Sequence, residues 1–354
     1  MDSNVNKEKL CLLKMLQIFR KNSDQDHPIT LLEVGKLLEQ EGLSCSRKTL
    51  GRDLKALKDA GYDFIKSNGS NQRGFYLAES SSFETAEVRV LMDAVLSAPF
   101  ITEEWTKQLV DHLKSLMSVH QAEDMCRQIS FDRTYKYKNG EIFYTIDTLE
   151  KAIRAKKKIR MVYQHQILWH NRVTLDFGRE FSLSPYALLW SHDKYYLACN
   201  YKKYDVVSNY RLDRMHKVEI MEEPARPFEE VCSYRGTFDA DDYLRHSFYM
   251  YNGERQTLLI RCKNSALEIM LDRFGDSLEF LECDNSKNVF TARTDVSISE
   301  GLYEWLLQYS GVMTVLSPTI VRHEMQERIR ELYKRYQCAP NFQNDDTERE
   351  EKTC

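Results

Sequence analysis

The stretch from Ser184 to Ile220 limits the fold most, because three short apolar runs follow one another there. The runs are Tyr186–Trp190, Tyr195–Asn200 and Val206–Leu212, and each has the length and the aromatic or β-branched content of a strand. Polar segments of hairpin-loop length separate them. The pattern predicts an antiparallel meander.

Aromatic rings and arginines lie side by side in this meander. Rings stack on flat ligands, and guanidinium groups bind phosphate through forked pairs of hydrogen bonds. We therefore expect an anionic ligand with flat rings. The candidate binding residues are Tyr195, Tyr196, Tyr210, Arg211 and Arg214, with Arg179 and Arg160 as outer members.

Strand alternation divides these candidates between two faces. Neighbouring side chains on a strand point in opposite directions. Leu197 and Leu212 are expected in the core, and residues two positions away share their face. We expect Tyr195 and Tyr210 to turn inward, Tyr196 and Arg211 to face a ligand, Arg214 to lie at the strand end, and Asp213 to hold an arginine in place.

Three features of this stretch match a known signature: the triplet Tyr195-Tyr196-Leu197, the later Arg211-Leu212-Asp213-Arg214, and the upstream Pro185. They resemble the WYL-domain transcription regulators of bacteria, in which the triplet is Trp-Tyr-Leu and the later stretch is Arg-x-x-Arg. The first triplet position departs from that pattern. The resemblance implies a small Sm-like or SH3-like β-barrel, and an effector that is a nucleotide or a single-stranded nucleic acid.

The region from residue 7 to residue 77 predicts three helices and a hairpin. In the first helix Leu10, Leu13, Leu16 and Ile18–Phe19 recur at roughly helical spacing. Thr30, followed by Glu33 three residues later, predicts a capping box at the start of the second helix. Strands on either side of a polar loop then predict a wing.

The third predicted helix carries the DNA-binding signal. Ser46 is a good N-cap, Gly61 ends the helix, and the face opposite the leucines is basic. The order helix, helix, basic helix, wing is that of a winged helix-turn-helix, and the helix resembles the recognition helix of DeoR-like regulators. Gly51 departs from their pattern; it allows either close approach of the backbone to DNA or neutral variation at an exposed position. The candidate DNA-binding residues are Ser46, Arg47, Lys48, Thr49, Arg52, Lys55 and Arg73.

A helical region follows between residues 83 and 125, broken by Pro99 and capped again at Thr102. We expect it to space the DNA-binding part from the sensor, and either to help dimerise the chain or to pack only on its own chain. Another helix is expected to open at Asp147 or Thr148 and to lead into the strands.

The last third of the chain predicts strand-helix-strand-strand-helix-strand plus a final helix. That is the ferredoxin-like plan, and it resembles the C-terminal extension of WYL regulators, which implies a role in dimerisation. The expected architecture is an α+β multidomain chain. Its parts are a winged helix-turn-helix at 1–80, a helical linker at 81–135, a WYL barrel at 140–225, an irregular linker at 226–255, a ferredoxin-like βαββαβ domain at 256–337 and a disordered polar tail at 338–354.

Composition excludes some classes of protein and leaves others open. The 354 residues contain no apolar run of membrane-spanning length, and the polar N-terminus is unlike a signal peptide. Nine scattered cysteines without a C-x-x-C pair favour reduced thiols and a cytoplasmic location. The net charge of −4 says little about nucleic acid, because binding depends on where the basic residues lie.

No catalytic motif, cofactor motif or metal-ligand spacing stands out. His165 and His170 lack a carboxylate at ligand spacing, and Cys199 reads as a core thiol. We therefore expect no enzyme, metal or cofactor, but a homodimeric regulator that binds operator DNA and an effector. The alternatives are an accessory protein that binds RNA or single strands and modulates a nuclease or defence system, and an enzyme acting on nucleotides.

Overall fold

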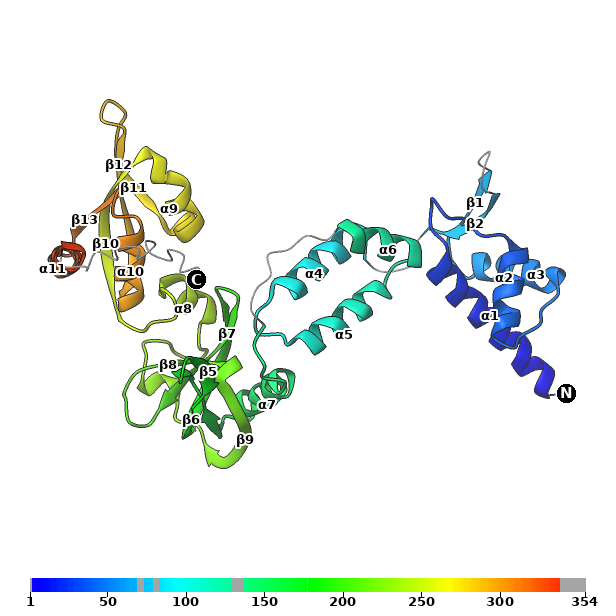
Figure 1. Cartoon of the computed structure of the whole chain (residues 1–354), viewed down its shortest axis with the longest axis horizontal. Coiled ribbons are helices and arrows are strands. Elements are labelled where there is room, and N and C mark those ends of the chain that lie inside the picture. The colour runs from blue at the N-terminus through cyan, green and yellow to red at the C-terminus, as the bar shows by residue number, and fades with distance from the viewer. Residues whose placement is uncertain (1, 69–72, 79–82, 129–135, 177, 338–354) are drawn as a thin grey trace, which may run out of the picture. The chain divides into compact units, whose positions relative to one another are not determined.

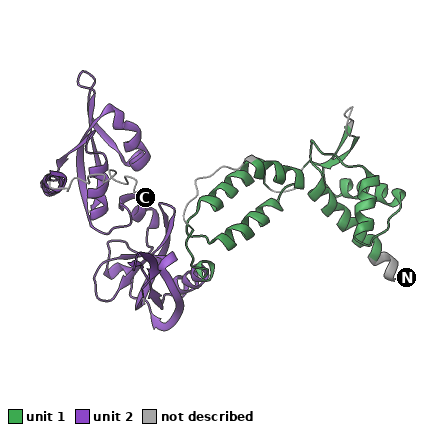
Figure 2. Cartoon of the chain, in the orientation of Figure 1, with its two compact units in different colours: residues 1–144 green, residues 145–354 purple. Residues whose placement is uncertain are grey.

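The computed structural model describes residues 2–68, 73–78, 83–128, 136–176 and 178–337. The chain divides into two compact units, Met1–Tyr144 and Thr145–Cys354 (Figure 2). Both mix helices with small sheets, so the expected α+β class is confirmed. Among the described residues, no helix combines the length and the apolar character that crossing a bilayer requires.

The first unit begins with the predicted three helices and hairpin (Figure 1). The capping box at Thr30 and the N-cap at Ser46 both form. Apolar residues of all these elements share one core, which includes Phe19, Leu38 and Leu50. The elements are α1 (Asp2–Asn22), α2 (Leu31–Gln40), α3 (Arg47–Asp59), β1 (Phe64–Asn68) and β2 (Arg73–Leu77).

The buried face of α1 is only partly the predicted one. Leu16, Ile18 and Phe19 are buried as predicted, whereas Leu10 and Leu13 are exposed. Cys11 and Met15 are buried in their place, eight and four residues before Phe19, so these three stack on one side of the helix. Cys11 also forms a disulfide bond with Cys45, just before α3, so the expectation of reduced thiols is wrong for this pair.

The next helical region has three helices where two were predicted. The predicted breaks at Pro99 and Thr102 are confirmed, but a further turn divides the second half at Ser118. Ser118 and Gln121 exchange side-chain and backbone hydrogen bonds of 3.2 Å, which start the last helix. The helices are α4 (Thr85–Ser97), α5 (Glu103–Lys114) and α6 (Val119–Gln128).

One buried contact joins the first three helices to this region. Asp24, after α1, accepts hydrogen bonds from the Ser118 hydroxyl and, at 2.9 Å, from the His27 ring. Burial alone raises the pKa of the Asp24 carboxyl, but these hydrogen bonds outweigh it and lower the pKa. The His27 ring stacks on His120 at 4.0 Å between centroids.

The helix expected to open at Asp147 or Thr148 begins earlier, as α7 (Ile142–Ala155). The Asn139 side chain accepts a hydrogen bond from the Glu141 backbone, which turns the chain before the helix. Ile142 is fully buried, so packing also favours the earlier start.

The meander forms a five-stranded antiparallel sheet with the strand order β8-β7-β6-β3-β9. The predicted strand Tyr186–Trp190 is part of a longer strand, which begins at Arg179 and has a register shift after Pro185. The third predicted run is shorter than expected, because a 3-10 turn (Leu212–Arg214) follows it. The strands are β3 (Lys157–Tyr163), β6 (Arg179–Ser191), β7 (Lys194–Tyr201), β8 (Ser208–Arg211) and β9 (Met215–Pro224); β4 (Gln166–Trp169) and β5 (Arg172–Leu175) form a separate exposed hairpin.

The segment 226–255, predicted as an irregular linker, is part of the packed second unit. It contains a 3-10 turn (Phe228–Glu230) and the helix α8 (Ala240–His246). Its apolar side chains cover the outer face of the sheet, where Leu189 and Ala198 are buried. The prediction failed because this face of the meander is apolar and needs cover, and Phe238, Tyr243 and Met250 supply it.

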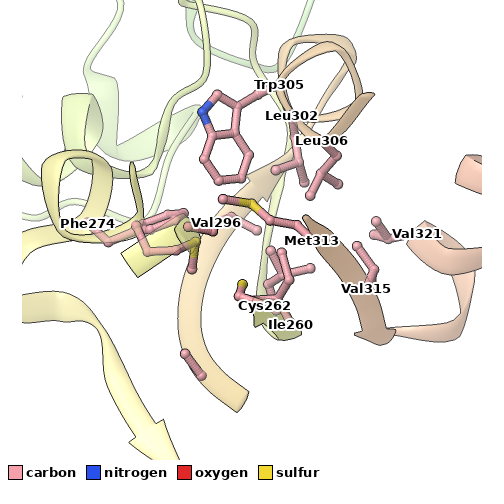
Figure 3. Packing of buried hydrophobic residues seen from close by; sticks show 14 of the residues in the cluster. Ile260, Cys262, Phe274, Val296, Leu302, Trp305, Leu306, Met313, Val315 and Val321 are labelled. Atoms are coloured by element: carbon pink, nitrogen blue, oxygen red, sulfur yellow. The ribbon is translucent and has the colours of Figure 1, made fainter. Parts of the chain in front are cut away.

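The C-terminal part has the predicted element order and a four-stranded sheet ordered β11-β12-β10-β13. One sheet face packs against its helices around a core that includes Ile260, Trp305 and Met313 (Figure 3). The elements are β10 (Glu254–Lys263), α9 (Leu267–Phe274), β11 (Glu279–Asp284), β12 (Val289–Ile298), α10 (Glu300–Gln308), β13 (Met313–Ser317) and α11 (Thr319–Gln337).

Candidate functional site

Helix α3 separates its residue types cleanly between two faces. Leu50, Leu54 and Leu57 are buried against α1 and α2. Five basic side chains of the helix are exposed, and the four nearest its N-terminal end come from nine consecutive residues. The helix therefore presents a basic ridge to its surroundings, made of Arg47, Lys48, Arg52 and Lys55.

The N-terminal end of this ridge is held by local hydrogen bonds. The Ser46 hydroxyl accepts a hydrogen bond of 3.1 Å from the Thr49 backbone and lies 2.9 Å from the Thr49 hydroxyl. Both hydroxyls are thus engaged in capping the helix. Gly51 faces open space, because a Cβ built on it meets no atom within 4 Å.

Two acidic residues modify the ridge. Arg52 lies 3.8 Å from the Glu8 carboxylate of α1, and both side chains are well exposed, so water screens this pair. Asp53 points the other way and is buried, and its Oδ2 has no hydrogen-bond partner among the described residues. Burial raises the pKa of the Asp53 carboxyl, and the nearby Arg52 opposes that rise.

The hairpin after α3 places Arg73 at the first position of β2, where the side chain is exposed. Gly74 lies against the backbone of Ile29, and a Cβ at Gly74 would come within 2.6 Å of it. This close approach fixes the hairpin beside the start of α2. The predicted loop residues 69–72 lie outside the described residues.

In the second unit, Arg211 is held by Asp213. Its Nε and one terminal nitrogen donate hydrogen bonds of 3.0 and 2.8 Å to the two oxygens of the carboxylate. The Asp213 side chain is 1% exposed and that of Arg211 15%. The predicted role of Asp213 is the one that the structure shows, and it leaves Arg211 with little of its fork for a ligand.

Tyr163 of β3 connects this ion pair to Arg214. Its hydroxyl accepts a hydrogen bond of 3.2 Å from the Arg211 backbone, and its ring meets Tyr210 and His165 edge-on. Burial raises the pKa of the Tyr163 hydroxyl, while the Arg211 backbone amide and Arg214 oppose the rise. Sequence reasoning missed Tyr163, although the alternation Ile159, Met161, Tyr163 marks it as a core-facing position.

Arg214 lies in the 3-10 turn, with one terminal nitrogen 3.5 Å from His165 Nδ1. It is half-buried. Tyr196 is the cross-strand partner of Arg211 on β7 and β8, so the two side chains share a face. Tyr196 is also half-buried, because the segment that covers the outer face reaches it. Burial raises the pKa of its hydroxyl, and the nearby Arg211 opposes the rise.

The remaining candidates lie around this cluster rather than in it. Tyr195 meets Trp190 edge-on at 4.8 Å, on the face that Leu197 fills. Arg179 is exposed and pairs in register with Tyr163, so it stands beside the cluster. Arg160 lies three positions from Tyr163, on the opposite face, and contacts Glu219 at 3.2 Å.

Three residues that were predicted to lie in the core are buried. Leu197 and Leu212 are fully buried, as predicted. Cys199 is a buried thiol whose pKa is raised by burial. Within the described residues, no three His, Cys, Asp or Glu side chains gather in a way that could hold a metal ion.

Comparison with family models assigns two regions of the second unit. Residues 144–220, which carry the Tyr163 cluster, match the WYL domain. The chain contains a WYL domain. Residues 254–333, the part with the four-stranded sheet, match the WCX domain. A comparison with curated proteins finds no match for the sequence.

Solved structures similar to this chain include two that match most of its length. Proteasome accessory factor B/C (PafBC) of Arthrobacter aurescens is 17% identical, with a TM-score of 0.27, over 92% of this chain and 48% of the other. The chain thus spans about half the length of PafBC. A CRISPR Cas-related protein is 13% identical, with a TM-score of 0.36, over 92% of this chain and 84% of the other.

Proposed function

We propose that this WYL-domain protein is a transcription regulator whose first unit binds duplex DNA. In this proposal α1–α3 and the β1–β2 hairpin form a winged helix-turn-helix, and α3 enters the major groove. The observation that carries the proposal is the basic ridge of α3. All four of its cations are exposed while the leucines of the same helix are buried, so the positive charge faces outward as phosphate binding requires.

Position along α3 assigns roles to the ridge residues. Arg47 and Lys48 lie in the first turn, which is the part of a recognition helix that reaches base edges. Arg52 lies one turn further along the same helix, and its weak pairing with Glu8 leaves it available to DNA. Lys55 is nearer the C-terminal end and is proposed to contact phosphate, as is Arg73 of the hairpin.

The WYL domain is proposed to bind the effector, a nucleotide or a single-stranded nucleic acid. Support comes from the side chains gathered there. The Tyr163 hydroxyl bonds the Arg211 backbone, Tyr196 lies across from Arg211, and His165 lies 3.5 Å from Arg214. Rings of this kind stack on bases, and arginines bind phosphate. The Arg214 side chain is proposed to contact the effector directly, and Arg211 is proposed to hold Arg214 in position. The five-stranded sheet is proposed to be the Sm-like or SH3-like barrel.

The WCX domain is proposed to be a ferredoxin-like dimerisation domain, which makes the regulator a homodimer. Exposed apolar residues on α11, Ile329, Tyr333 and Tyr336, support an interface there. Effector binding would shift the dimer between two states with different affinities for DNA. The proposed role consists of binding alone and includes no chemical reaction.

The test begins by selecting operator sequences from a random duplex library with the full chain. Mobility shifts on the selected duplex then compare Arg47→Ala and Arg52→Ala with Arg172→Ala, an exposed arginine of the β4–β5 hairpin in the second unit. A base-reading arginine is expected to lose ~1–3 kcal/mol of binding free energy, about 5- to 150-fold in affinity. The Arg172 variant should bind like the parent chain.

Two results decide against the proposal. Unchanged operator affinity in both α3 variants would show that the helix does not read DNA. A preference for single strands or RNA over every selected duplex would favour the accessory-protein alternative. The effector role is tested separately with Arg214→Ala, which should keep operator affinity and lose the response to added nucleotides or oligonucleotides.

A further inference from the structure

The first unit contains a cavity of about 760 Å³ between the C-terminal end of α1 and the corner formed by α5 and α6. Its volume is that of pockets that bind small organic molecules. The floor is apolar, with Met117 and Ala122 buried and Val119 half-buried. Methionine adapts its shape readily to different apolar ligands. The cavity lies in a different compact unit from the Tyr163 cluster, and no proposed function assigns it.

Charge around the rim is mostly positive. Four cations line the cavity against two acids. Lys114 lies 3.4 Å from Asp111, and Arg127 lies 3.5 Å from Asp124, so two of the cations have partners. The two others stand on the last turn of α1, and the structure pairs neither of them with an acid among the described residues; they are Arg20 and Lys21.

The surroundings of these two cations leave their positive charge available to an anion. Arg20 lies 5.8 Å from the centroid of the Tyr62 ring, a contact that leaves its charge in place. Lys21 is exposed beside it. Glu123 on α6 is the remaining acid of the rim, so the unpaired charges sum in favour of the cations. An apolar floor below unpaired cations matches a molecule with an apolar body and one acid group.

We propose that this cavity binds a small amphipathic organic anion. The apolar body lies on Met117, Val119 and Ala122, and the acid group meets Arg20 and Lys21 at the mouth. The proposal does not depend on the function proposed above. Because the lining comes from α1 on one side and from α5 and α6 on the other, a bound anion favours the arrangement in which these helices face each other.

Two cysteines of the chain allow occupancy of the cavity to be measured. Cys126 is a free, exposed cysteine that lines the cavity, and Cys283 is a free, exposed cysteine on β11 in the second unit. The full chain is treated with iodoacetamide, with or without dodecanoate below its micelle concentration. Peptide mass spectrometry then gives the alkylation rate at each cysteine. Dodecanoate is expected to slow alkylation of Cys126 several-fold and to leave Cys283 unchanged.

Two further probes separate the parts of the ligand. Dodecanol has the apolar body without the charge, and inorganic phosphate has the charge without the apolar body. Neither should protect Cys126 at the dodecanoate concentration that does. Equal protection by dodecanol would overturn the proposed anionic class, and equal protection of Cys283 would show only general surfactant binding. No protection by dodecanoate would overturn the site itself.

Variants test the rim and the floor. Lys21→Glu is expected to weaken the protection by dodecanoate ~5-fold, the size typical of an exposed ion pair. Lys107→Glu makes the same charge change at an exposed position of α5 that does not line the cavity, and should have no effect. Ala122→Phe fills the floor and should abolish protection, with circular dichroism confirming that the chain is folded. Equal loss in the Lys21 and Lys107 variants would refute the role of the rim cations.

Discussion

The ion pair between Arg211 and Asp213 allows a quantitative prediction. Asp213 is almost fully buried, and both of its oxygens accept hydrogen bonds from one guanidinium. Removing one partner of such a pair leaves a buried charge without compensation, which costs ~3–5 kcal/mol. Arg211 keeps some access to water, so we expect Asp213→Ala to lose ~3 kcal/mol, at the lower end. For a unit of this size, that corresponds to a fall in Tm of about 6–12 °C.

The double variant Arg211→Met/Asp213→Leu provides the matched comparison. It removes both charges and keeps apolar volume, and such replacements are often neutral or stabilising. We therefore expect it to unfold at a higher temperature than Asp213→Ala, although it carries one more substitution. Differential scanning calorimetry of the full chain measures both, and the single variants complete a double-mutant cycle.

The reasoning fails if the effects of the two sites simply add. Independent sites add within ~0.5 kcal/mol, whereas a coupled pair should depart from additivity by at least ~1 kcal/mol. An additive cycle would mean that the stability comes from the packing around Leu212, and that Asp213 does not hold the guanidinium. In that case Arg211 would again be a candidate for direct contact with the proposed effector.

Three further outcomes follow from the first unit. Because burial raises the pKa of Asp53, its folded pKa exceeds the unfolded value of ~3.9, and stability falls as pH rises through the interval between the two; Asp53→Asn should therefore raise Tm at pH 7 and give no gain near pH 3. Reducing the Cys11–Cys45 disulfide with dithiothreitol should lower unfolding free energy by ~3–4 kcal/mol in denaturant titrations, as expected for residues 34 positions apart. Gly51→Ala should stabilise α3 by up to ~1 kcal/mol, because its Cβ meets open space, and a mobility shift then shows whether the backbone must approach DNA there.

Local signals in the sequence predicted most of the elements correctly. The capping residues Thr30, Ser46 and Thr102 each start a helix, because their side chains bond to backbone amides only three residues away. The order of strands and helices along the C-terminal part could also be predicted, because short apolar runs and helical runs alternate there without long insertions. These features depend on neighbours in the chain, so one sequence is enough to find them.

Features that depend on distant partners were the ones missed. The exposure of Leu10 and Leu13 follows from which side of α1 the other helices occupy, and helical spacing alone fits either side. The cover over the outer sheet face was read as a linker, because Phe238 and Tyr243 stand among polar and glycine residues without a regular period. Burial on both faces of a sheet becomes visible only when the segment that supplies the second cover is known.

The candidate effector site also depends on distant partners that the local pattern does not reveal. Alternation placed Tyr196 and Arg211 on one face, and register pairing agrees with that. Strand alternation does not predict, however, whether a side chain is accessible to a ligand. Tyr196 is partly covered by the segment on the outer face, and Arg211 is bonded to a carboxylate two residues away. The second arginine of the motif, Arg214, lies in a 3-10 turn, which removes it from the strand period altogether. Its neighbours Tyr163 and His165 are about fifty residues earlier in the chain. The arginine motif therefore locates the candidate site, whereas the turn and the nearby carboxylate decide which guanidinium is already paired within the chain.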